Sequence, residues 1–331
     1  MKGLLSFLAG FLLVSQAWGQ QRPQYSQYMI NNYLLNPAIS GIEDYTDVKI
    51  GSRHQWVGLD GAPVTYYVSA HTPLNKQATQ VRSVGKGIGR THKTNVSRLS
   101  KPQPHQGVGI MALTDKTGPL RRSNIMGTYA YHLPISREFK VAVGVGAGML
   151  NSRFNPSEAT MVIDGDPAIT SDYVNYTYFD LNVGTWIYSK DFFLGLSGAQ
   201  LLKSRGDLNA AENGSRLQKH YFATIGYRFQ VSQDLTLIPS TMIKMASPSP
   251  VSVDINLRAL YADRLWVGGS YRNKDSFSVL AGVYLNQLLD LSYAYDINTS
   301  NLGVANSGSH EVVVGLKLFN KGRVICPIYM R

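Results

Sequence analysis

The histidines of the chain are the first residues to test for catalysis or metal binding. No two of them are four residues apart, and no His-Glu-x-x-His run occurs. Helical zinc motifs place two imidazoles on one face, one turn apart, so the sequence supports no metal site. The seven histidines are His54, His71, His92, His105, His132, His220 and His310.

Other candidate chemistry is equally sparse. The run Gly195-Leu196-Ser197-Gly198-Ala199 lacks the last glycine of a nucleophile elbow and lies within a predicted strand. The run Gly85-Lys86-Gly87-Ile88-Gly89 has neither the spacing nor the Lys-Ser/Thr end of a phosphate-binding loop. Asp290 and Asp296 could form a polar network or simply line water. We expect no enzyme and no cofactor, and a Ser/His pair assembled from distant strands is the alternative.

The composition is typical of an outer-membrane barrel. The 331 residues include 20 Tyr, 31 Gly and a single Cys, and only 16% are charged. A secreted soluble domain of this size often carries paired cysteines, which this chain cannot form. The net charge of +11 favours anionic lipid headgroups or acidic protein partners, because an exported chain is an improbable ligand for nucleic acid.

Residues 1–19 have the pattern of a secretory signal peptide. Lys2 supplies a positive start, an apolar run extends from Leu4 to Val14, and Ala17-Trp18-Gly19 offers small residues for cleavage. No later stretch approaches the roughly 18 apolar residues of a transmembrane helix. We therefore predict export to the outer membrane.

An apolar residue at every second position predicts the strands of the barrel. In 289–296, Leu289, Leu291, Tyr293 and Tyr295 alternate with small or acidic residues, and 141–148, 192–199 and 312–318 behave alike. One apolar and one small or polar face is the transmembrane β pattern. We predict an all-β fold, a transmembrane antiparallel β-barrel of about 14 strands, with strands near 45–56, 63–74, 106–114, 122–134, 139–151, 173–189, 191–202, 219–231, 234–245, 252–262, 264–273, 276–286, 289–297 and 310–319.

The connections alternate in length, which supports a barrel over the alternative of a soluble sandwich. Short connections are expected at 136–138, 189–190, 232–233, 262–263 and 287–288. Long ones are expected at 152–172, 203–218 and 298–309. Barrels have short periplasmic turns and long outer loops, and an even strand number returns both ends to the periplasm.

One connection departs from this rule. Residues 75–105 fall where a short periplasmic turn belongs, and they contain several basic residues and no acidic one. They are either a solvated insertion or a basic arm that binds an acidic partner or lipid headgroups. Its candidate partner-binding residues are Arg82, Lys86, Arg90 and Lys93. The tail 320–331 carries Cys326, which is either an unpaired thiol or a site of pairing with a partner.

The segment 20–44, between the signal and the barrel (45–319), has neither a strand nor a transmembrane period. Its tyrosines offer stacking and hydrogen-bonding surface, while Asn36-Pro37 and Gly41 turn the chain. We predict that it packs against or enters the periplasmic mouth as a plug or docking element. Its candidate partner-binding residues are Tyr25, Gln27, Tyr28, Tyr33 and Asn36.

The stretch from Trp56 to Pro63 should join the first two strands. Asp60-Gly61 suits a turn with positive φ, Pro63 fixes the start of the next strand, and Trp56 suits the membrane interface. A well-formed hairpin accounts for all of these. The candidate structural residues are Pro37, Gly41, Trp56, Gly58, Asp60, Gly61, Pro63 and His71.

These motifs occur in a specific order. PQYSQYM (23–29), Asn36-Pro37-Ala38, RHQWVGLDGAP (53–63), SAHTPL (69–74) and DKTGP (115–119) follow one another, and Cys-Pro stands near the end. The series closely resembles the start of the PorP/SprF family of type IX secretion system membrane proteins. The resemblance implies an outer-membrane barrel that associates with periplasmic ring and lipoprotein subunits. Some members serve particular exported substrates, including gliding adhesins. The basic insertion departs from the short connection expected there.

Two functional hypotheses follow. The first is a non-enzymatic secretion component that anchors the machinery or receives a secreted surface protein, with contacts on the N-terminal segment and on loops 151–172 and 298–309. The second is a transport barrel for small hydrophobic molecules, similar to fatty-acid channels. An apolar lumen and an opening in the wall would favour transport.

Overall fold

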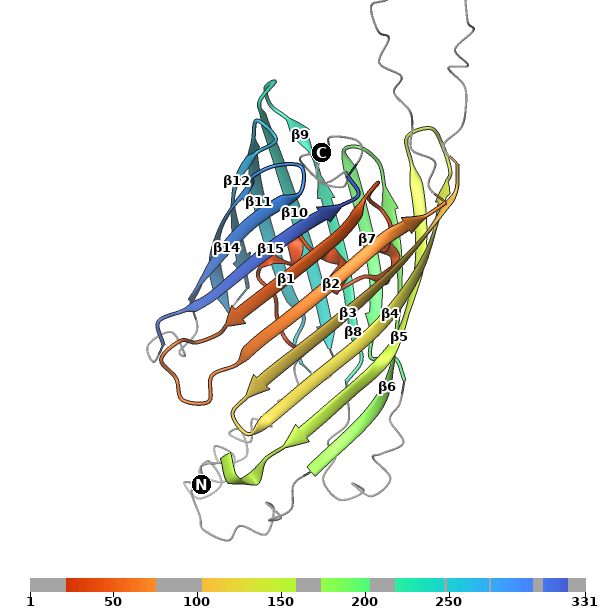
Figure 1. The fold of residues 1–331 in the computed structure, drawn as a ribbon. Helices are drawn as coiled ribbons and strands as arrows, with labels where there is room; N and C mark the ends of the chain where they lie inside the picture. The colour runs from red at the N-terminus through yellow and green to blue at the C-terminus, as the bar shows by residue number, and fades with distance from the viewer. Residues whose placement is uncertain are drawn as a thin grey trace, which may run out of the picture.

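A single antiparallel sheet closes into a barrel (Figure 1). The computed structural model describes residues 22–75, 103–158, 174–202, 218–246, 249–273, 275–299 and 306–320. The strands are β1 (Thr46–His54), β2 (Val64–Leu74), β3 (His105–Thr117), β4 (Leu120–Pro134), β5 (Lys140–Phe154), β6 (Val174–Tyr188), β7 (Phe192–Ala199), β8 (His220–Tyr227), β9 (Phe229–Gln230), β10 (Leu235–Ala246), β11 (Ser252–Tyr261), β12 (Leu265–Arg272), β13 (Ser276–Tyr284), β14 (Leu289–Asn298) and β15 (Ser309–Leu318).

The ring has fourteen strands, as predicted. Among the described residues the sheet has fifteen strands, and β9 pairs with β10 alone. The other fourteen pair with their neighbours along the chain, and β1 pairs with β15 to close the ring. Closure leaves no open edge at the first and last strands, which a membrane-spanning sheet requires.

The short strand β9 continues β8 in the same register. Gly226 of β8 pairs with Ser240, and Gln230 of β9 pairs with Thr236, so four residues on one side match four on the other. In this register Pro239 lies opposite Tyr227. Proline has no amide hydrogen, so the ladder breaks there. The predicted strand 219–231 therefore forms two strands, β8 and β9, because Pro239 of β10 interrupts the pairing between them.

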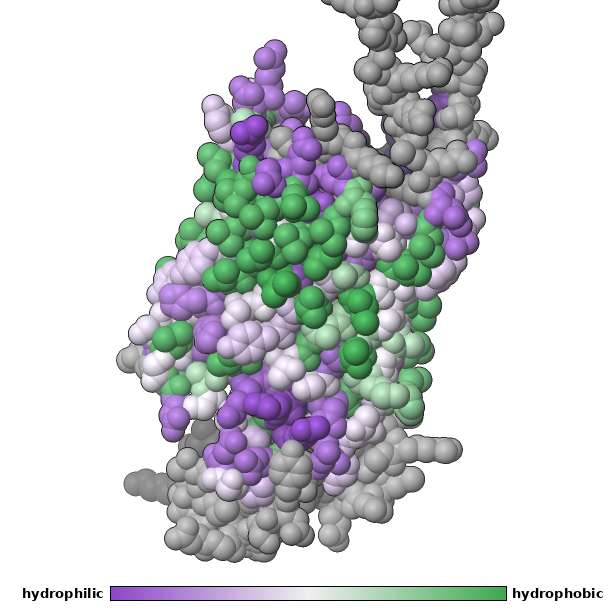
Figure 2. All heavy atoms as spheres, in the orientation of Figure 1, coloured by the Kyte–Doolittle hydropathy of each residue, from purple (hydrophilic) through white to green (hydrophobic). Residues whose placement is uncertain are grey.

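The two faces of the wall have the predicted composition. In β14, Asp290, Ser292, Ala294 and Asp296 are buried inside, while Leu291 and Tyr293 are exposed outside. Hydrophobic side chains gather on the outer face, and hydrophilic ones lie towards its two ends (Figure 2). Exposed apolar residues of the outer face include Ile50, Val68, Val143, Val145, Val279 and Val312.

The connections define the two ends of the barrel. Five short connections, 135–139, 189–191, 231–234, 262–264 and 285–288, lie at one end, which we name the short-turn end, although the two-residue turn 118–119 lies at the other end. The other end is named the long-loop end. The short turns agree with the prediction. At the long-loop end β3, β4 and β5 are longer than predicted, whereas β1, β7 and β12 end one to three residues earlier than predicted.

The strand extensions have a physical reason. β3 runs to Thr117 and β5 to Phe154, so Asp115, Lys116 and Thr117 lie in the ladder and not in a turn. Backbone pairing continues past the point where apolar residues stop alternating. Hydropathy therefore marks the part of a strand that faces lipid and misses the part that extends into water.

The N-terminal segment, residues 22–45, has no strand and lies within the ring (Figure 1). It forms three short 3₁₀ helices, η1 (Gln27–Met29), η2 (Asn32–Leu34) and η3 (Pro37–Ile39). The Asn36 side chain caps η3 by accepting a 3.0 Å hydrogen bond from the Ala38 amide, and Pro37 occupies the first helical position. All residues from Tyr25 to Glu43 are buried.

None of the helices among the described residues is long and apolar enough to cross a membrane. The predicted signal peptide (1–19), the insertion residues Arg82, Lys86, Arg90 and Lys93, and Cys326 lie outside the described residues.

The position of a charged side chain across the membrane should determine how much it lowers the unfolding free energy. Val145→Arg places a cation in the apolar part of β5, and we expect a loss of about 2–4 kcal/mol in unfolding free energy. Asn151→Arg, on the same strand and face but near the long-loop end, is the control and should cost about 0–1 kcal/mol. Urea unfolding in lipid bilayers measures both, and equal costs would contradict the assigned membrane span.

Candidate functional site in the barrel interior

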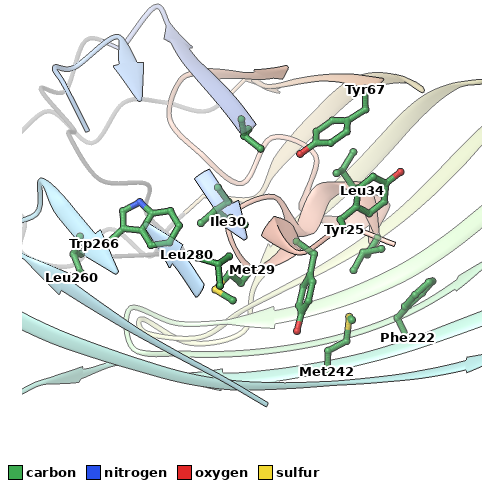
Figure 3. Close-up of a cluster of buried hydrophobic side chains, with 14 of the residues drawn as sticks. Tyr25, Met29, Ile30, Leu34, Tyr67, Phe222, Met242, Leu260, Trp266 and Leu280 are labelled. Carbon is green, nitrogen blue, oxygen red and sulfur yellow. The ribbon is translucent and has the colours of Figure 1, made fainter. Parts of the chain in front are cut away.

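Apolar side chains of the N-terminal segment pack on the inner wall. Tyr25, Met29, Ile30 and Leu34 all point from the segment into one buried cluster (Figure 3). On the wall side the cluster includes Tyr67, Phe222, Met242, Leu260, Trp266 and Leu280. These residues come from both sides of the ring, so the segment fills the space between them.

A second apolar cluster holds the later part of the segment. Tyr33, Ala38, Ile39 and Ile42 are buried against the wall. Their wall neighbours in this cluster are Met111, Met126, Ala142, Trp186 and Tyr188. Close packing of this kind makes the occupied lumen resemble the core of a soluble domain.

The wall approaches η3 closely because glycines line it there. A β-carbon on Gly144 would lie 2.4 Å from the amide nitrogen of Ala38. One on Gly107 would lie 1.9 Å from the carbonyl oxygen of Ser40. Gly41 has φ of +73° and rests against Gly107, so it needs both the small size and the left-handed backbone of glycine.

A buried ionic network ties the segment to four strands. Arg53 of β1 bridges Asp296 of β14 at 2.7 Å and Glu311 of β15 at 3.1 Å. The Ser26 amide donates to Glu311 Oε2 at 2.7 Å, and the Ser26 hydroxyl donates to Asp296 Oδ2 at 2.6 Å. Tyr67 of β2 also donates to Glu311. Buried charges are stable only when their remaining hydrogen-bonding capacity is met, and Ser26 supplies part of it.

A second network binds the start of the segment. Arg272 of β12 pairs with Asp254 of β11 at 3.0 Å and donates to the side-chain oxygen of Gln24 at 2.7 Å. Asn256 donates to the Tyr28 hydroxyl at 2.7 Å. The segment therefore completes the polar contacts of two neighbouring strands.

Three histidines surround the turn at Ser40 and Gly41. The rings of His105 and His132 stack with centroids 4.3 Å apart, and their Nε2 atoms donate to the carbonyls of Gly41 at 3.0 Å and Ser40 at 2.8 Å. The Gly41 amide donates to Nδ1 of His71 at 3.3 Å. Among the described residues no group of three His, Cys, Asp or Glu could hold a metal ion. These imidazoles bind peptide groups. The sequence had singled out His71 as a structural residue but gave no signal for His105 and His132.

The five candidate residues of the segment all contact the wall. Gln27 donates to the Glu311 carbonyl at 2.8 Å, and Asn36 donates to the Thr185 carbonyl at 3.0 Å. The Tyr33 hydroxyl shares a 2.7 Å hydrogen bond with Thr128. Burial raises the pKa of Tyr25 to about 12 and that of Tyr33 to about 12, so both phenols keep their protons at physiological pH. Tyr28 is also buried.

The segment extends along the barrel. Arg22 lines a cavity with Asp115 and Asp180 at the long-loop end, while Gly41 rests on Pro73 and Gly107 near the short-turn end. Its contacts are therefore distributed along the inner wall and reach well beyond one mouth.

The stretch from Trp56 to Pro63 connects β1 and β2 at the long-loop end. Gly61 has positive φ, as predicted for the Asp60-Gly61 turn, whereas the positive φ of Gly58 and the φ of +47° at Trp56 were not predicted. The Gly118 amide donates to the Gly61 carbonyl at 2.9 Å, so this loop is joined to the β3–β4 turn. Pro63 directly precedes β2, and Asp60 is exposed.

A side chain at Gly144 should displace the segment. Gly144→Val would place methyl groups in the space of Ala38, and we expect a loss of about 1–3 kcal/mol in stability together with faster proteolysis of the segment. Gly127→Val on β4 is the matched control, because a β-carbon there would meet only the Ala147 carbonyl oxygen at 4.0 Å. Equal protease resistance of both variants would refute the close contact.

The Arg53 guanidinium should be essential for stability. Arg53→Ala leaves Asp296 and Glu311 buried without their cation, so we expect a loss of about 3–5 kcal/mol. Lys116→Ala removes an exposed ion pair with Glu158 and should change the unfolding midpoint little. Denaturant titration in detergent measures both variants, and a small effect of Arg53→Ala would contradict the network.

Several solved structures are similar to the chain at low identity. The Ralstonia pickettii toluene transporter TbuX has 9% identity and a TM-score of 0.49, with 86% of this chain and 92% of that chain covered. The Acinetobacter baumannii outer membrane protein Omp33 has 8% identity and a TM-score of 0.46, with 84% and 100% covered. A Pseudomonas aeruginosa FadL homologue has 12% identity and a TM-score of 0.45, with 90% and 94% covered. At these values none of them transfers a substrate to this chain.

No curated protein matches the sequence. The profile of the family described as "Type IX secretion system membrane protein PorP/SprF" matches residues 17–316, which is most of the chain. The match spans the N-terminal segment and nearly all of the barrel, and together with the barrel fold it points to the outer membrane. The chain belongs to the PorP/SprF family of type IX secretion system membrane proteins.

Proposed function

We propose that this barrel is a non-enzymatic outer-membrane component of the type IX system, which anchors the machinery and receives a secreted surface protein such as a gliding adhesin. The observation that carries the proposal is the occupied lumen. Residues 25–43 are buried between opposite walls and held by ionic, hydrogen-bonded and apolar contacts. A filled barrel leaves its two ends as the surfaces available for partners.

The N-terminal segment acts as a plug in this proposal. The support for it is the match between segment and wall, which includes glycines under η3 and buried charges that require Ser26 and Gln24. A water-filled pore would need none of these contacts. The segment also joins β1 directly at Thr46, so it is positioned from the first strand.

The two ends have different partners in this proposal. The short-turn end is the periplasmic side, since barrels have their short turns there. Periplasmic ring and lipoprotein subunits bind at that end, with the basic insertion 75–105 available for acidic partners or lipid headgroups. The exported client binds at the long-loop end.

Transport of small hydrophobic molecules is the competing function. It requires a free apolar path, and the apolar residues of the lumen are instead engaged in two packed clusters with the segment. Uptake of such a ligand by the purified protein, without any partner, would favour transport over the proposal.

Deletion of the N-terminal segment should abolish function while the barrel still folds. Deletion of residues 23–41 is expected to abolish export of the client. The purified, shortened barrel is expected to conduct ions in planar bilayers, whereas the full protein is not. Heat-modifiable migration on gels verifies that the shortened barrel is folded. Normal client export by a folded, shortened barrel would refute the role of the segment.

Capture under mild detergent tests the proposed partners. Affinity purification of the native protein should recover secretion subunits or one large exported protein, identified by mass spectrometry. Recovery of the barrel alone under conditions that preserve the assembled machinery would contradict the anchoring role.

A further inference from the structure

Three basic residues form a row on the outer face of the barrel, which we name the cationic row. Lys116 of β3 pairs with Arg121 of β4, and Arg121 pairs with Arg153 of β5. The adjacent residues Asp115 and Arg122 line a cavity of the lumen. Successive side chains of a strand point to opposite faces, and paired residues share a face, so all three basic side chains point outward. All three residues are exposed.

The cationic row carries more positive charge than its contacts among the described residues neutralise. Lys116 forms an ion pair with Glu158 at 2.8 Å, in which both side chains are about half exposed. Arg153 donates from Nε to the side chain of Asn151 at 2.8 Å, whereas Arg121 forms no hydrogen bond or ion pair with the described part of the chain. Like charges directly opposite each other destabilise a strand pair, so an external anion would stabilise the row.

Two further rows on the same strands and the same face show where the cations lie relative to the membrane. Two residues along each strand the side chains are polar and uncharged, and after two more they are apolar. Each step of two residues is about 7 Å along the strand. The apolar row is exposed at Ile125 and Met149. The polar row is Thr114, Ser123 and Asn151, and the apolar row is Ala112, Ile125 and Met149.

The cationic row therefore lies just outside the apolar part of the wall, at the level of lipid headgroups. Hydrophilic side chains gather at the long-loop ends of β3, β4 and β5, and apolar side chains lie further along the wall (Figure 1, Figure 2). Barrels have their long loops at the cell surface, so these headgroups belong to the outer leaflet. Lipid meets the row in this position whatever else binds the barrel.

The order of the three rows indicates the class of lipid. Cations, then hydroxyl and amide groups, then apolar side chains correspond to the phosphate, sugar and acyl chains of a phosphorylated glycolipid. A peptide or a small anion has no such order. Neighbouring strands lie about 4.8 Å apart, so three cations extend over about 10 Å, which is wider than a single phosphate group. A headgroup with two phosphates fits this width.

We propose that the cationic row of Lys116, Arg121 and Arg153 binds the phosphates of a glycolipid of the outer leaflet, whose acyl chains lie on the apolar row of the same strands. Guanidinium groups suit this ligand because their planar donors form two-point contacts with phosphate oxygens. The proposal goes beyond the proposed function, because lipid binding at this row requires neither the secretion machinery nor its client.

Binding of lipid A, the phosphorylated glycolipid of lipopolysaccharide, tests the proposal. The full protein in a neutral detergent is titrated with lipid A that carries two phosphates, and bound lipid is counted by native mass spectrometry. We expect lipid A to bind in preference to phosphatidylcholine. Lipid A with a single phosphate should bind more weakly, and inorganic phosphate at the same concentration should not displace the lipid.

Two double variants locate the site. Arg121→Gln with Arg153→Gln removes two cations, each worth about fivefold in affinity for an anionic headgroup, so lipid A should bind about 25-fold more weakly. Arg137→Gln with Lys190→Gln is the matched control, because it removes two exposed cations from the short-turn end. The control should bind lipid A like the unaltered protein. Heat-modifiable migration verifies that both variants are folded.

Three results would overturn the proposal. Equal affinity of the two double variants for lipid A would exclude the cationic row as the site. Equal binding of lipid A and phosphatidylcholine would indicate that acidic residues of this chain neutralise the row. Displacement of lipid A by inorganic phosphate would identify the ligand as a small anion and not a lipid.

Discussion

Contact between the N-terminal segment and the inner wall is the interaction on which the rest of the structure depends. A ring of fourteen strands encloses a space that must be filled by water or by protein. Here Arg53, Asp296 and Glu311 face inward and are buried. Charges in such a position require partners, and Ser26 supplies hydrogen bonds to both carboxylates. The segment therefore stabilises the buried charges of the wall.

This dependence explains features that look unrelated along the chain. Gly107 and Gly144 lie on different strands, yet both are small because the same turn of the segment passes over them. His105 and His132 stack on each other because both donate to adjacent carbonyls of that turn. The first residues after the predicted signal thus determine which side chains the wall can carry.

The sequence allowed the wall to be predicted but not its contents. Alternation in 289–296 requires only that lipid lies on one side, so it is visible locally, and the structure confirms the fourteen strands. The ends of β3 and β5 were missed because pairing continues where Lys116 and Arg153 replace apolar residues. The bond between Ser26 and Glu311 joins residues 285 positions apart, and no local pattern signals such a pair.

The position of the segment can be tested in lipid bilayers by solid-state nuclear magnetic resonance of the full protein. Through-space cross-peaks should connect the Tyr33 ring with Thr128 and the Ser26 amide with the Glu311 side chain, because these groups are in hydrogen-bond contact. The resonances of residues 25–43 should have the intensity of a rigid backbone. Absent cross-peaks, together with sharp signals typical of a mobile chain, would contradict the account.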